Sequence, residues 1–279
     1  MTGPSPETAA ANTGRPAGRQ IVAMRNVSKI FSNGTLALKD MSLDVARGEF
    51  LSLLGPSGCG KSTALRIIAG LGAPSSGTID WPTSSLNAKG LPQGDIGFVF
   101  QEPTLTPWST VFGNVYLPLK LQGQSKSAAR PRVMEMLATV GLADFADAYP
   151  RELSGGMKMR VSIARALVTK PRLLLMDEPF AALDEITRQK LNDDVLRIWE
   201  QSGITIIFVT HSVFESAYLS SRIVVMKARP GQVYTDIPLQ HTIARGTNYR
   251  TSEEYRATTD TVSRALQQAI ELGGGSVGH

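Results

Sequence analysis

One eight-residue stretch constrains the fold of this chain more than any other. Residues 55–62 read Gly-Pro-Ser-Gly-Cys-Gly-Lys-Ser and match G-x-x-x-x-G-K-[ST] at every fixed position. An apolar run at 48–54 predicts a strand before it, and Leu65, Ile68 and Leu71 predict a helix over 61–71 after it. Glycines in this setting let successive N–H groups point at an anion, and the helix adds its positive dipole end. The stretch therefore predicts a phosphate-binding loop.

The chemistry of this loop follows from its last residues. We expect Lys61 to reach the β and γ phosphates of a nucleotide and the Ser62 hydroxyl to contact Mg²⁺. The residues predicted to contact the nucleotide here are Gly55, Ser57, Gly58, Cys59, Gly60, Lys61, Ser62 and Thr63. A phosphate-binding loop alone names only a superfamily, so kinases, GTPases and DNA-associated ATPases remain open at this point.

Two adjacent acids at the end of an apolar run supply a second motif. The run Leu173–Met176 leads into Asp177 and Glu178, the arrangement called Walker B. We expect Asp177 to hold the Mg²⁺ shell and Glu178 to act as the general base that polarises an attacking water. The alternative is an ordinary solvated turn.

Alternating patterns along the chain predict an α/β fold with a mainly parallel sheet. The apolar runs at 173–176 and 204–209 lack polar alternation, as strands buried on two faces do, and a helical pattern at 185–201 separates them. Strand signals fade between about 103 and 170, which predicts a helical subdomain inserted into the core. Residues 1–20 have the composition of a disordered leader, and 234–279 of a C-terminal extension with a helix at about 258–272 and a flexible end.

Composition and charge exclude several classes of protein. The longest apolar runs have strand length, short of the roughly 18 to 20 residues that a membrane-spanning helix requires. The sole cysteine, Cys59, has no intrachain partner, which fits a reducing compartment. The net charge of +5 is dispersed without a block of like charges, so we expect no binding of nucleic acid.

A third motif narrows the superfamily. Leu153-Ser154-Gly155-Gly156-Met157 places a hydroxyl and two bare glycine N–H groups at a predicted helix start, which suits a second phosphate site. The alternative is an ordinary N-cap for that helix. The motif resembles the signature of ABC ATPases, which other enzymes with this phosphate-binding loop lack. The resemblance implies a RecA-like P-loop NTPase core, an inserted helical subdomain and an N-terminal antiparallel β region.

The resemblance covers about 21–233 and supplies further site residues in the expected order. Phe31 matches the aromatic that stacks on adenine, although a core phenylalanine is the alternative. Gln101 resembles the Q-loop glutamine, which contacts Mg²⁺, and Asp184 lies in a segment that resembles the D-loop. His211 resembles the switch histidine at the γ-phosphate. The residues expected to act in catalysis are thus Glu178, His211 and Lys61, with Ser62, Gln101 and Asp177 expected at the metal.

The signature departs from its commonest form because Met157 replaces glutamine. A methionine there resembles the subfamily that imports nitrate, sulfonates, taurine and pyrimidine precursors, as do residues 101–114 and 227–231. The resemblance implies ATP and Mg²⁺ as ligands and a peripheral protein at the cytoplasmic face of the cell membrane.

The resemblance also implies partner proteins. These are a second ATPase subunit that forms a homodimer, transmembrane permease subunits and an extracytoplasmic solute-binding protein. Two alternatives are an exporter ATPase and a soluble ABC ATPase without a permease. The single cassette, with no heptad run for a coiled coil, disfavours the soluble type.

Overall fold

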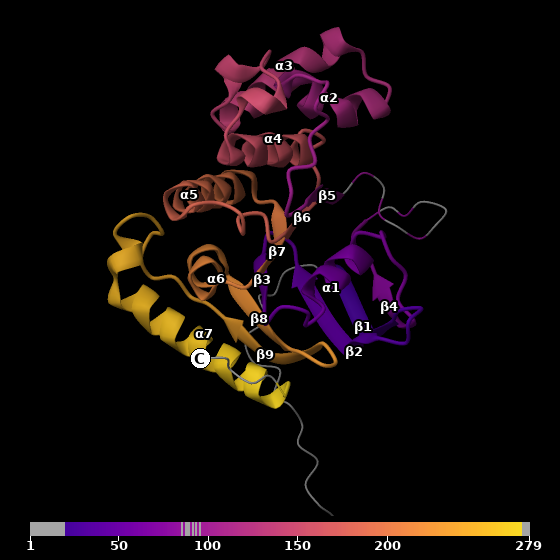
Figure 1. The fold of residues 1–279 in the computed structure, drawn as a ribbon, viewed down its shortest axis with the longest axis vertical. Helices are drawn as coiled ribbons and strands as arrows, with labels where there is room; N and C mark the ends of the chain where they lie inside the picture. Colours follow the sequence, from indigo (N-terminus) through magenta and orange to yellow (C-terminus); the bar gives the residue numbers. More distant parts are fainter. Residues whose placement is uncertain are drawn as a thin grey trace, which may run out of the picture.

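The computed structural model describes residues 20–84, 86, 90, 92, 94 and 96–274. The predicted disordered leader lies outside the described residues except for Gln20, and so does the predicted flexible end from 275 onward. The described chain is an α/β fold with two sheets and a layer of helices at one end (Figure 1).

The central sheet has six strands in the order β5-β6-β7-β3-β8-β9. All neighbouring pairs are parallel except β8 and β9, so the predicted mainly parallel sheet is confirmed. Every residue of β3, β6 and β7 is buried, which explains why these three segments lack polar alternation in the sequence. The strands are β3 (Phe50–Leu54), β5 (Ile96–Val99), β6 (Leu173–Asp177), β7 (Thr205–Thr210), β8 (Arg222–Lys227) and β9 (Gln232–Pro238).

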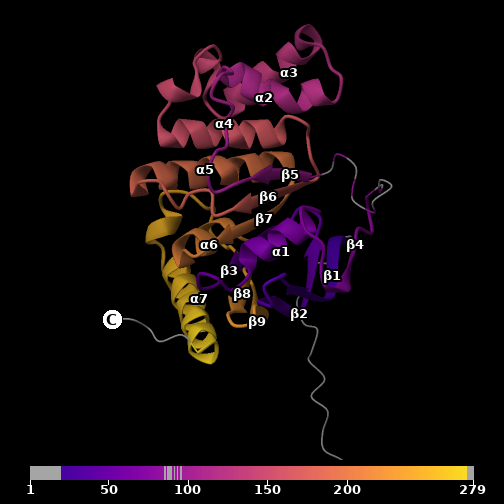
Figure 2. The ribbon, with the colours of Figure 1, turned by 45° about the vertical axis from the view of Figure 1, so that its right-hand side comes forward.

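A smaller antiparallel sheet is formed by β1 (Gln20–Ile30), β2 (Leu36–Ala46) and β4 (Ser76–Asp80), in the order β2-β1-β4. Helix α1 (Lys61–Ile68) lies between the two sheets, and its apolar side chains share one core with both (Figure 2). The predicted extension of this helix to Leu71 is wrong. The helix ends at Ile68, and Leu71 is 61% exposed, so of the three residues that predicted the helix only Leu65 and Ile68 belong to its buried face.

Helices α2 (Val111–Leu121), α3 (Lys126–Thr139) and α4 (Gly155–Leu167) form the layer at the top of Figure 1, within the segment predicted to be helical. Short 3₁₀ turns at Ala143–Phe145 and Pro150–Glu152 connect α3 to α4. Helix α5 (Glu185–Ser202) lies between this layer and the sheet, and the three share one apolar core. Helix α4 contacts both α2 and α5, so it joins the layer to the rest of the molecule.

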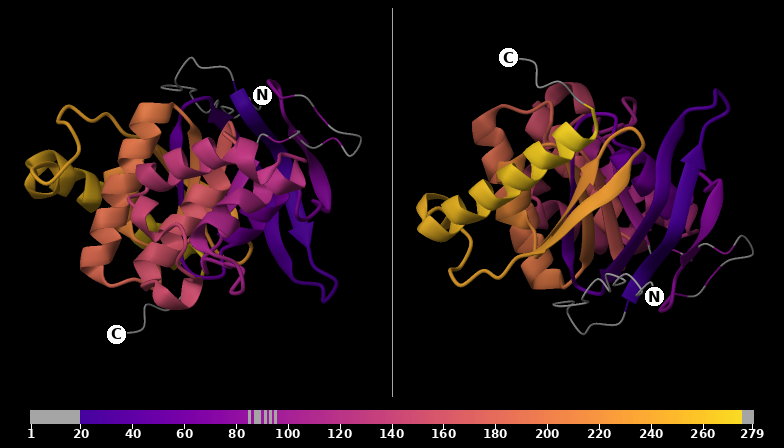
Figure 3. Two further views of the ribbon diagram at one scale, coloured as in Figure 1. Left: turned by 90° about the horizontal axis from the view of Figure 1, so that it is seen from above. Right: turned by 90° about the horizontal axis from the view of Figure 1, so that it is seen from below.

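The C-terminal part consists of α6 (Val213–Leu219), a 3₁₀ turn at Tyr249–Thr251, and α7 (Glu253–Leu272). Helix α7 packs beside β8, β9 and α6, on the side opposite the antiparallel sheet (Figure 3). It begins five residues before the predicted start because the Ser252 hydroxyl accepts a hydrogen bond from the Tyr255 N–H and caps it. Strand β9 runs from residue 232 to 238, across the boundary between 233 and 234 at which the sequence placed the start of the extension.

Candidate functional site

The predicted phosphate-binding loop lies between β3 and α1, at the carboxyl edge of the central sheet. Gly60 has a φ of +91°, which glycine adopts without the steric cost that other residues incur. A Cβ at this position would also lie 2.6 Å from a Leu38 methyl and 2.9 Å from the Ala37 carbonyl oxygen. Glycine is therefore required by backbone conformation and by the close approach of β2.

Lys61 is buried beneath this loop. Its Nζ donates hydrogen bonds to the carbonyl oxygens of Gly55 at 2.7 Å and Pro56 at 3.1 Å. The same ammonium lies 3.7 Å from Glu178 Oε1. The carbonyls of the loop thus hold the Lys61 ammonium in place. The phosphate oxygens of a nucleotide can replace these carbonyls as hydrogen-bond acceptors.

Cys59 is fully buried, and its Sγ lies 3.9 Å from Lys61 Nζ, beneath the loop. A Cβ on Gly55 would lie 2.7 Å from that sulfur. Burial raises the pKa of the thiol above its ordinary value, and the nearby Lys61 charge opposes the shift. The buried thiol therefore cannot contact a nucleotide, and the backbone N–H is the group of Cys59 that can donate to a phosphate.

Ser62 and Asp177 meet at the end of β6. The Ser62 hydroxyl donates to Asp177 Oδ1 at 2.7 Å. Burial raises the pKa of the Asp177 carboxyl, and the hydrogen bond from Ser62 partly opposes that shift. Two oxygen ligands of the kind that Mg²⁺ prefers therefore lie side by side at this edge of the sheet.

Glu178 and His211 come from neighbouring strands. Glu178 follows β6 with a φ of +46°, so the chain turns immediately after Asp177 and the two carboxylates point differently. Its N–H donates to the Val209 carbonyl of β7 at 3.0 Å. His211, just after β7, places Nδ1 3.3 Å from Glu178 Oε2. Glu178 thus lies between an ammonium and an imidazole, which is a suitable position for a base that acts on water.

A cavity of about 420 Å³ opens beside these groups. Phe31 lines it and is 44% exposed, so the alternative of a core phenylalanine is wrong. Among the predicted site residues, those that line the cavity are Phe31, Gly58, Gly60, Lys61, Ser62, Thr63 and Glu178. We refer to Lys61, Ser62, Asp177, Glu178 and His211 as the phosphate-loop cluster.

Gln101 lies in a bend after β5, where it is exposed and does not line this cavity. The register of β5 and β6 pairs Val99 with Met176, so Gln101 extends beyond the same carboxyl edge as Asp177. The structure places it at the correct edge of the sheet but not among the groups that surround the cavity.

The signature segment, residues 153–157, lies at the start of α4 and does not line the cavity either. The Ser154 hydroxyl is exposed and accepts from the Met157 N–H at 3.3 Å, as an N-cap does. Gly156 is buried, and a Cβ there would lie 2.5 Å from Thr187 Cγ2 on α5. This glycine therefore lets α4 approach α5 closely.

Asp184 caps α5 beside the signature segment. Its Oδ1 accepts from the Thr187 N–H at 2.9 Å, and hydrogen bonds from Thr187 lower the pKa of this exposed carboxyl. A Cβ on Gly155 would contact Leu183 at 3.4 Å. Apart from Gln101, the predicted residues thus form two groups: the phosphate loop and its cluster with Phe31, and the signature segment with Asp184.

A family profile described as ABC transporter matches residues 38–181, a range that holds the phosphate-binding loop, the signature segment and Asp177–Glu178. The chain belongs to the ABC transporter family. This ABC protein is an ATP-binding subunit and an ATPase. None of the helices in the described part of the chain combines the length and apolar character needed to cross a membrane.

Among its relatives, the ABC protein is 48% identical over 213 residues to the uncharacterized ABC transporter ATP-binding protein MJ0412 of Methanocaldococcus jannaschii, covering 75% of this chain and 79% of that one. It is 42% identical over 235 residues to the aliphatic sulfonates import ATP-binding protein SsuB of Bacillus subtilis, covering 84% and 89%. A solved dimer of the ATP-binding cassette MJ0796, in a post-hydrolysis state with ADP and Pi, is 36% identical with a TM-score of 0.69, covering 79% of this chain and 99% of that one.

Two parts of the cavity wall in this ABC protein were missed by sequence reasoning. Residues 35–37, at the start of β2, line it and carry no motif. Arg229 and Gly231 also line it, because the loop after β8 packs against both the phosphate loop and β2. A Cβ on Gly231 would lie 2.2 Å from the Cys59 carbonyl oxygen, and the Gly231 N–H donates to the Ala37 carbonyl of β2 at 3.1 Å. In the sequence, 227–231 indicated only a subfamily. Because β8 pairs with β3 in the sheet, the loop that follows β8 lies beside the phosphate loop that follows β3.

Glu215 is a further missed residue, located close to the loop that carries His211. Its buried carboxylate accepts a hydrogen bond from the Thr210 hydroxyl and lies 3.6 Å from Arg188 Nε. Arg188 in turn donates to the Leu183 carbonyl at 2.9 Å. The network connects the loop that carries His211 to the loop before Asp184. In the sequence, Ser212-x-x-Glu215 resembles a capping box. That pattern indicates only a helix start and does not predict the contact of Glu215 with Arg188.

Proposed function

We propose that this ABC ATPase powers an importer for small anionic or polar solutes of the sulfonate type. The observation that carries the transport assignment is the 42% identity to SsuB along 84% of the chain. The geometry that carries the ATPase half is the convergence of Lys61, Ser62–Asp177 and Glu178–His211 on one cavity whose wall includes Phe31. Selectivity for the solute belongs to the partner proteins, because the ATPase does not touch it.

In this proposal each residue has one task. Phe31 stacks on adenine, and Lys61 exchanges the Gly55 and Pro56 carbonyls for β and γ phosphate oxygens. The Glu178 carboxylate accepts a proton from the attacking water, and His211 contacts the γ-phosphate and orients Glu178. The Ser62 and Asp177 oxygens fit Mg²⁺ as ligands, with Gln101 as a third contact, and the ion neutralises phosphate charge when bound.

The signature segment suggests that the working form is a homodimer. Ser154 is exposed and lies outside the cavity wall, so within one chain it has no phosphate to bind. A second copy in head-to-tail orientation supplies one, with the Ser154 hydroxyl and glycine N–H groups of each chain completing the site of the other. The neighbouring cassette structure with ADP and Pi is a dimer, which supports a dimeric working form. ATP then closes the dimer, and hydrolysis lets it open.

Mixed dimers test this arrangement with two variants that are each inactive as homodimers. Lys61→Ala removes the phosphate contact, and Ser154→Ala removes the signature hydroxyl. In a head-to-tail dimer of one chain of each kind, one site has two defects and the other has none. We expect the mixture to hydrolyse ATP faster than either variant alone. A mixture that stays at the average of the two separate rates contradicts completion between chains.

The remaining partners follow from the importer assignment. We propose transmembrane permease subunits, an extracytoplasmic solute-binding protein, and a peripheral location at the cytoplasmic face of the membrane. The test is ATPase activity of the chain reconstituted with its permease and binding protein in liposomes, with aliphatic sulfonates, taurine, nitrate and a pyrimidine precursor offered in turn. We expect stimulation by at least one sulfonate. An exporter predicts stimulation by solute on the ATPase side, and a soluble ATPase predicts no permease complex at all.

A further inference from the structure

The loop between β5 and α2 carries Gln101 and connects the central sheet to the helical layer (Figure 1). Gln101 lies two residues after the end of β5 and is exposed. Among the described residues, none holds the Gln101 side chain by a hydrogen bond. The position of Gln101 relative to Asp177 therefore depends on how the chain is held on either side of it.

Before Gln101, the chain is held by the sheet. Val99, the last residue of β5, pairs with Met176 of β6, the residue before Asp177. A Cβ on Gly97 would lie 2.7 Å from the Ala166 carbonyl oxygen, so β5 and α4 approach each other closely. The residue before Ala166 on α4 therefore lies beside the loop that leaves β5.

After Gln101, the chain is held by that residue, Arg165. Its Nη2 donates to the Pro103 carbonyl at 2.9 Å, and its Nη1 donates to the Thr104 carbonyl at 2.9 Å. Nη2 also donates to the Thr104 hydroxyl at 3.0 Å. One guanidinium thus binds three oxygen atoms of two successive residues, with a planar fork that a single ammonium does not reproduce.

The backbone at this contact is strained. Thr104 has a φ of +46°, a conformation that is unfavourable for a β-branched residue. Such a residue persists where its surroundings hold it, and this is frequent at functional sites. The later part of the loop has separate support, because the buried Asn114 amide forms hydrogen bonds with the backbone within 106–110. The segment that carries Gln101 therefore depends on β5 and on Arg165.

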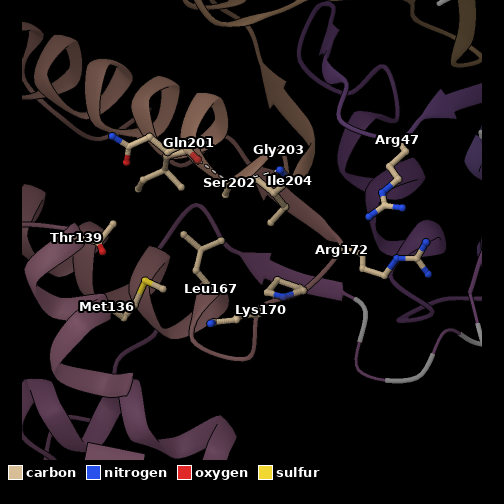
Figure 4. A pocket seen from close by; sticks show the side chains of 12 residues that line it. Arg47, Met136, Thr139, Leu167, Lys170, Arg172, Gln201, Ser202, Gly203 and Ile204 are labelled. Carbon is tan, nitrogen blue, oxygen red and sulfur yellow. Dashed lines mark hydrogen bonds between the residues drawn. The ribbon is translucent and has the colours of Figure 1, made fainter. Parts of the chain in front are cut away.

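The helix end alone does not account for Arg165. The carboxyl end of α4 favours basic side chains, and Arg47 and Lys170 line a cavity of about 400 Å³ beside this end (Figure 4). Arg165 differs from them because it is partly buried, and burial lowers the pKa of its guanidinium. Within the described part of the chain, no carboxylate forms an ion pair with it. The loop oxygens are the partners that compensate for the desolvation of this charge.

We propose that Arg165 is a positioning residue for Gln101, which it holds at the carboxyl edge of the sheet so that Gln101 Oε1 reaches the metal beside Asp177. The inference rests on the metal contact proposed for Gln101 above. Arg165 itself lies outside the cavity wall and acts through the loop. Because its fork fixes the chain two residues beyond Gln101, less conformational freedom is lost when the glutamine binds the metal. Loss of the fork should therefore weaken metal binding.

The test is the affinity of the full chain for Mn²⁺, used in place of Mg²⁺, with the non-hydrolysable ATP analogue AMP-PNP bound. Electron paramagnetic resonance of free Mn²⁺ measures this affinity without turnover. Gln101→Ala and Arg165→Gln should each raise the Kd for Mn²⁺ about tenfold. The double variant should bind no more weakly than either single variant, because the second change removes a contact that is already lost.

The sign of the Arg165→Gln effect separates positioning from charge. Removal of a positive charge near the metal, by itself, strengthens the binding of a cation. Tighter Mn²⁺ binding in Arg165→Gln, or losses that multiply in the double variant, overturns the inference. An unchanged Kd in Arg165→Gln also overturns it and leaves the proposed role of Gln101 intact. An unchanged Kd in Gln101→Ala removes that proposed role, and the inference with it.

A matched control lies on the same helix. Arg160 of α4 pairs with Asp194 and donates to the Val140 carbonyl, away from the Gln101 loop, so Arg160→Gln should leave the Kd for Mn²⁺ unchanged. Thr104→Val removes only the hydroxyl acceptor of an exposed residue and should raise the Kd about threefold. It tests the same contact if Arg165→Gln fails to fold, which the Tm and the affinity for AMP-PNP without metal report. An unchanged Kd in Thr104→Val, or an equal rise in Arg160→Gln, contradicts the inference.

Discussion

The phosphate-binding loop and the signature segment both place glycines and a hydroxyl at the start of a helix, yet their surroundings differ. Around the first, Lys61, Asp177, Glu178 and His211 come together beside a cavity from the ends of two strands and the start of one helix. Around the second, the exposed Ser154 hydroxyl accepts a capping hydrogen bond from the Met157 N–H. The comparison teaches that a sequence motif specifies local hydrogen-bond donors, whereas catalysis needs groups that tertiary structure brings together.

The largest expected effect is on the rate of ATP hydrolysis, which depends on the phosphate-loop cluster and its base Glu178. Glu178→Gln retains the shape of the side chain but cannot accept a proton, so we expect the rate of ATP hydrolysis to fall about 10²-fold or more. ATP binding should persist. Single-turnover assays with labelled ATP measure both quantities. The control is Glu185→Gln, which removes an exposed carboxylate from α5. Hydrolysis within about tenfold of wild type shows that Glu178 is not the base.

The next prediction concerns the cavity beside the phosphate-loop cluster, which no residue of the signature segment lines. Phe31→Ala should weaken ATP binding roughly 5- to 150-fold, since base stacking on an aromatic ring contributes about 1–3 kcal/mol. Phe31 is 44% exposed, so the Tm without nucleotide should change little. Phe145→Ala removes a ring that is 43% exposed in the helical layer and should leave affinity intact. Unchanged affinity in Phe31→Ala removes this residue from the nucleotide site.

A third prediction tests whether the signature segment has a packing role besides its proposed phosphate contact. Gly156→Ala puts a methyl group 2.5 Å from Thr187 Cγ2, an overpacking that should cost about 1–3 kcal/mol and lower the Tm by several degrees. Thr187→Ser removes that methyl and retains the hydroxyl beside Asp184. The double variant should therefore recover most of the lost Tm. Failure of the rescue places the glycine requirement elsewhere.

The smallest expected effect is on stability at the phosphate-loop cluster itself. Burial raises the pKa of Asp177, so its ionised form is disfavoured in the folded chain. The stability contributed by the protonated carboxyl is complete below its unfolded pKa and is lost as pH rises through the raised folded pKa. Asp177→Asn removes this loss. Without nucleotide or Mg²⁺, the variant should therefore unfold about 2–4 °C above wild type at pH 7, and by less at pH 4.

Calorimetry at the two pH values measures that difference, with Asp144→Asn as an exposed control. The same variant should lose ATPase activity, since it removes a carboxylate oxygen proposed for Mg²⁺. A variant that is less stable than wild type at both pH values shows that the Ser62–Asp177 hydrogen bond outweighs the desolvation of the charge.

The sequence by itself determined the parts of this protein whose physics is local. Four such parts depend on residues adjacent in the chain, so sequence patterns can predict them. They are the phosphate loop, the buried strand before Asp177, and the capped starts of α4 and α5. The α/β class and the ABC family follow from those patterns. Even here, helix α1 ends three residues early, since spacing does not reveal where its buried face stops.

Tertiary structure alone decided which of these parts meet. The position of Gly231 against the phosphate loop depends on β8 pairing with β3, across more than half of the chain, and no local pattern encodes that register. The same holds for Glu215 and Arg188, and for the cavity that gathers Arg47 and Lys170 from distant loops. Strand order and helix packing are set by burial of the whole apolar surface, which is non-directional, so its outcome emerges only when all the elements pack together.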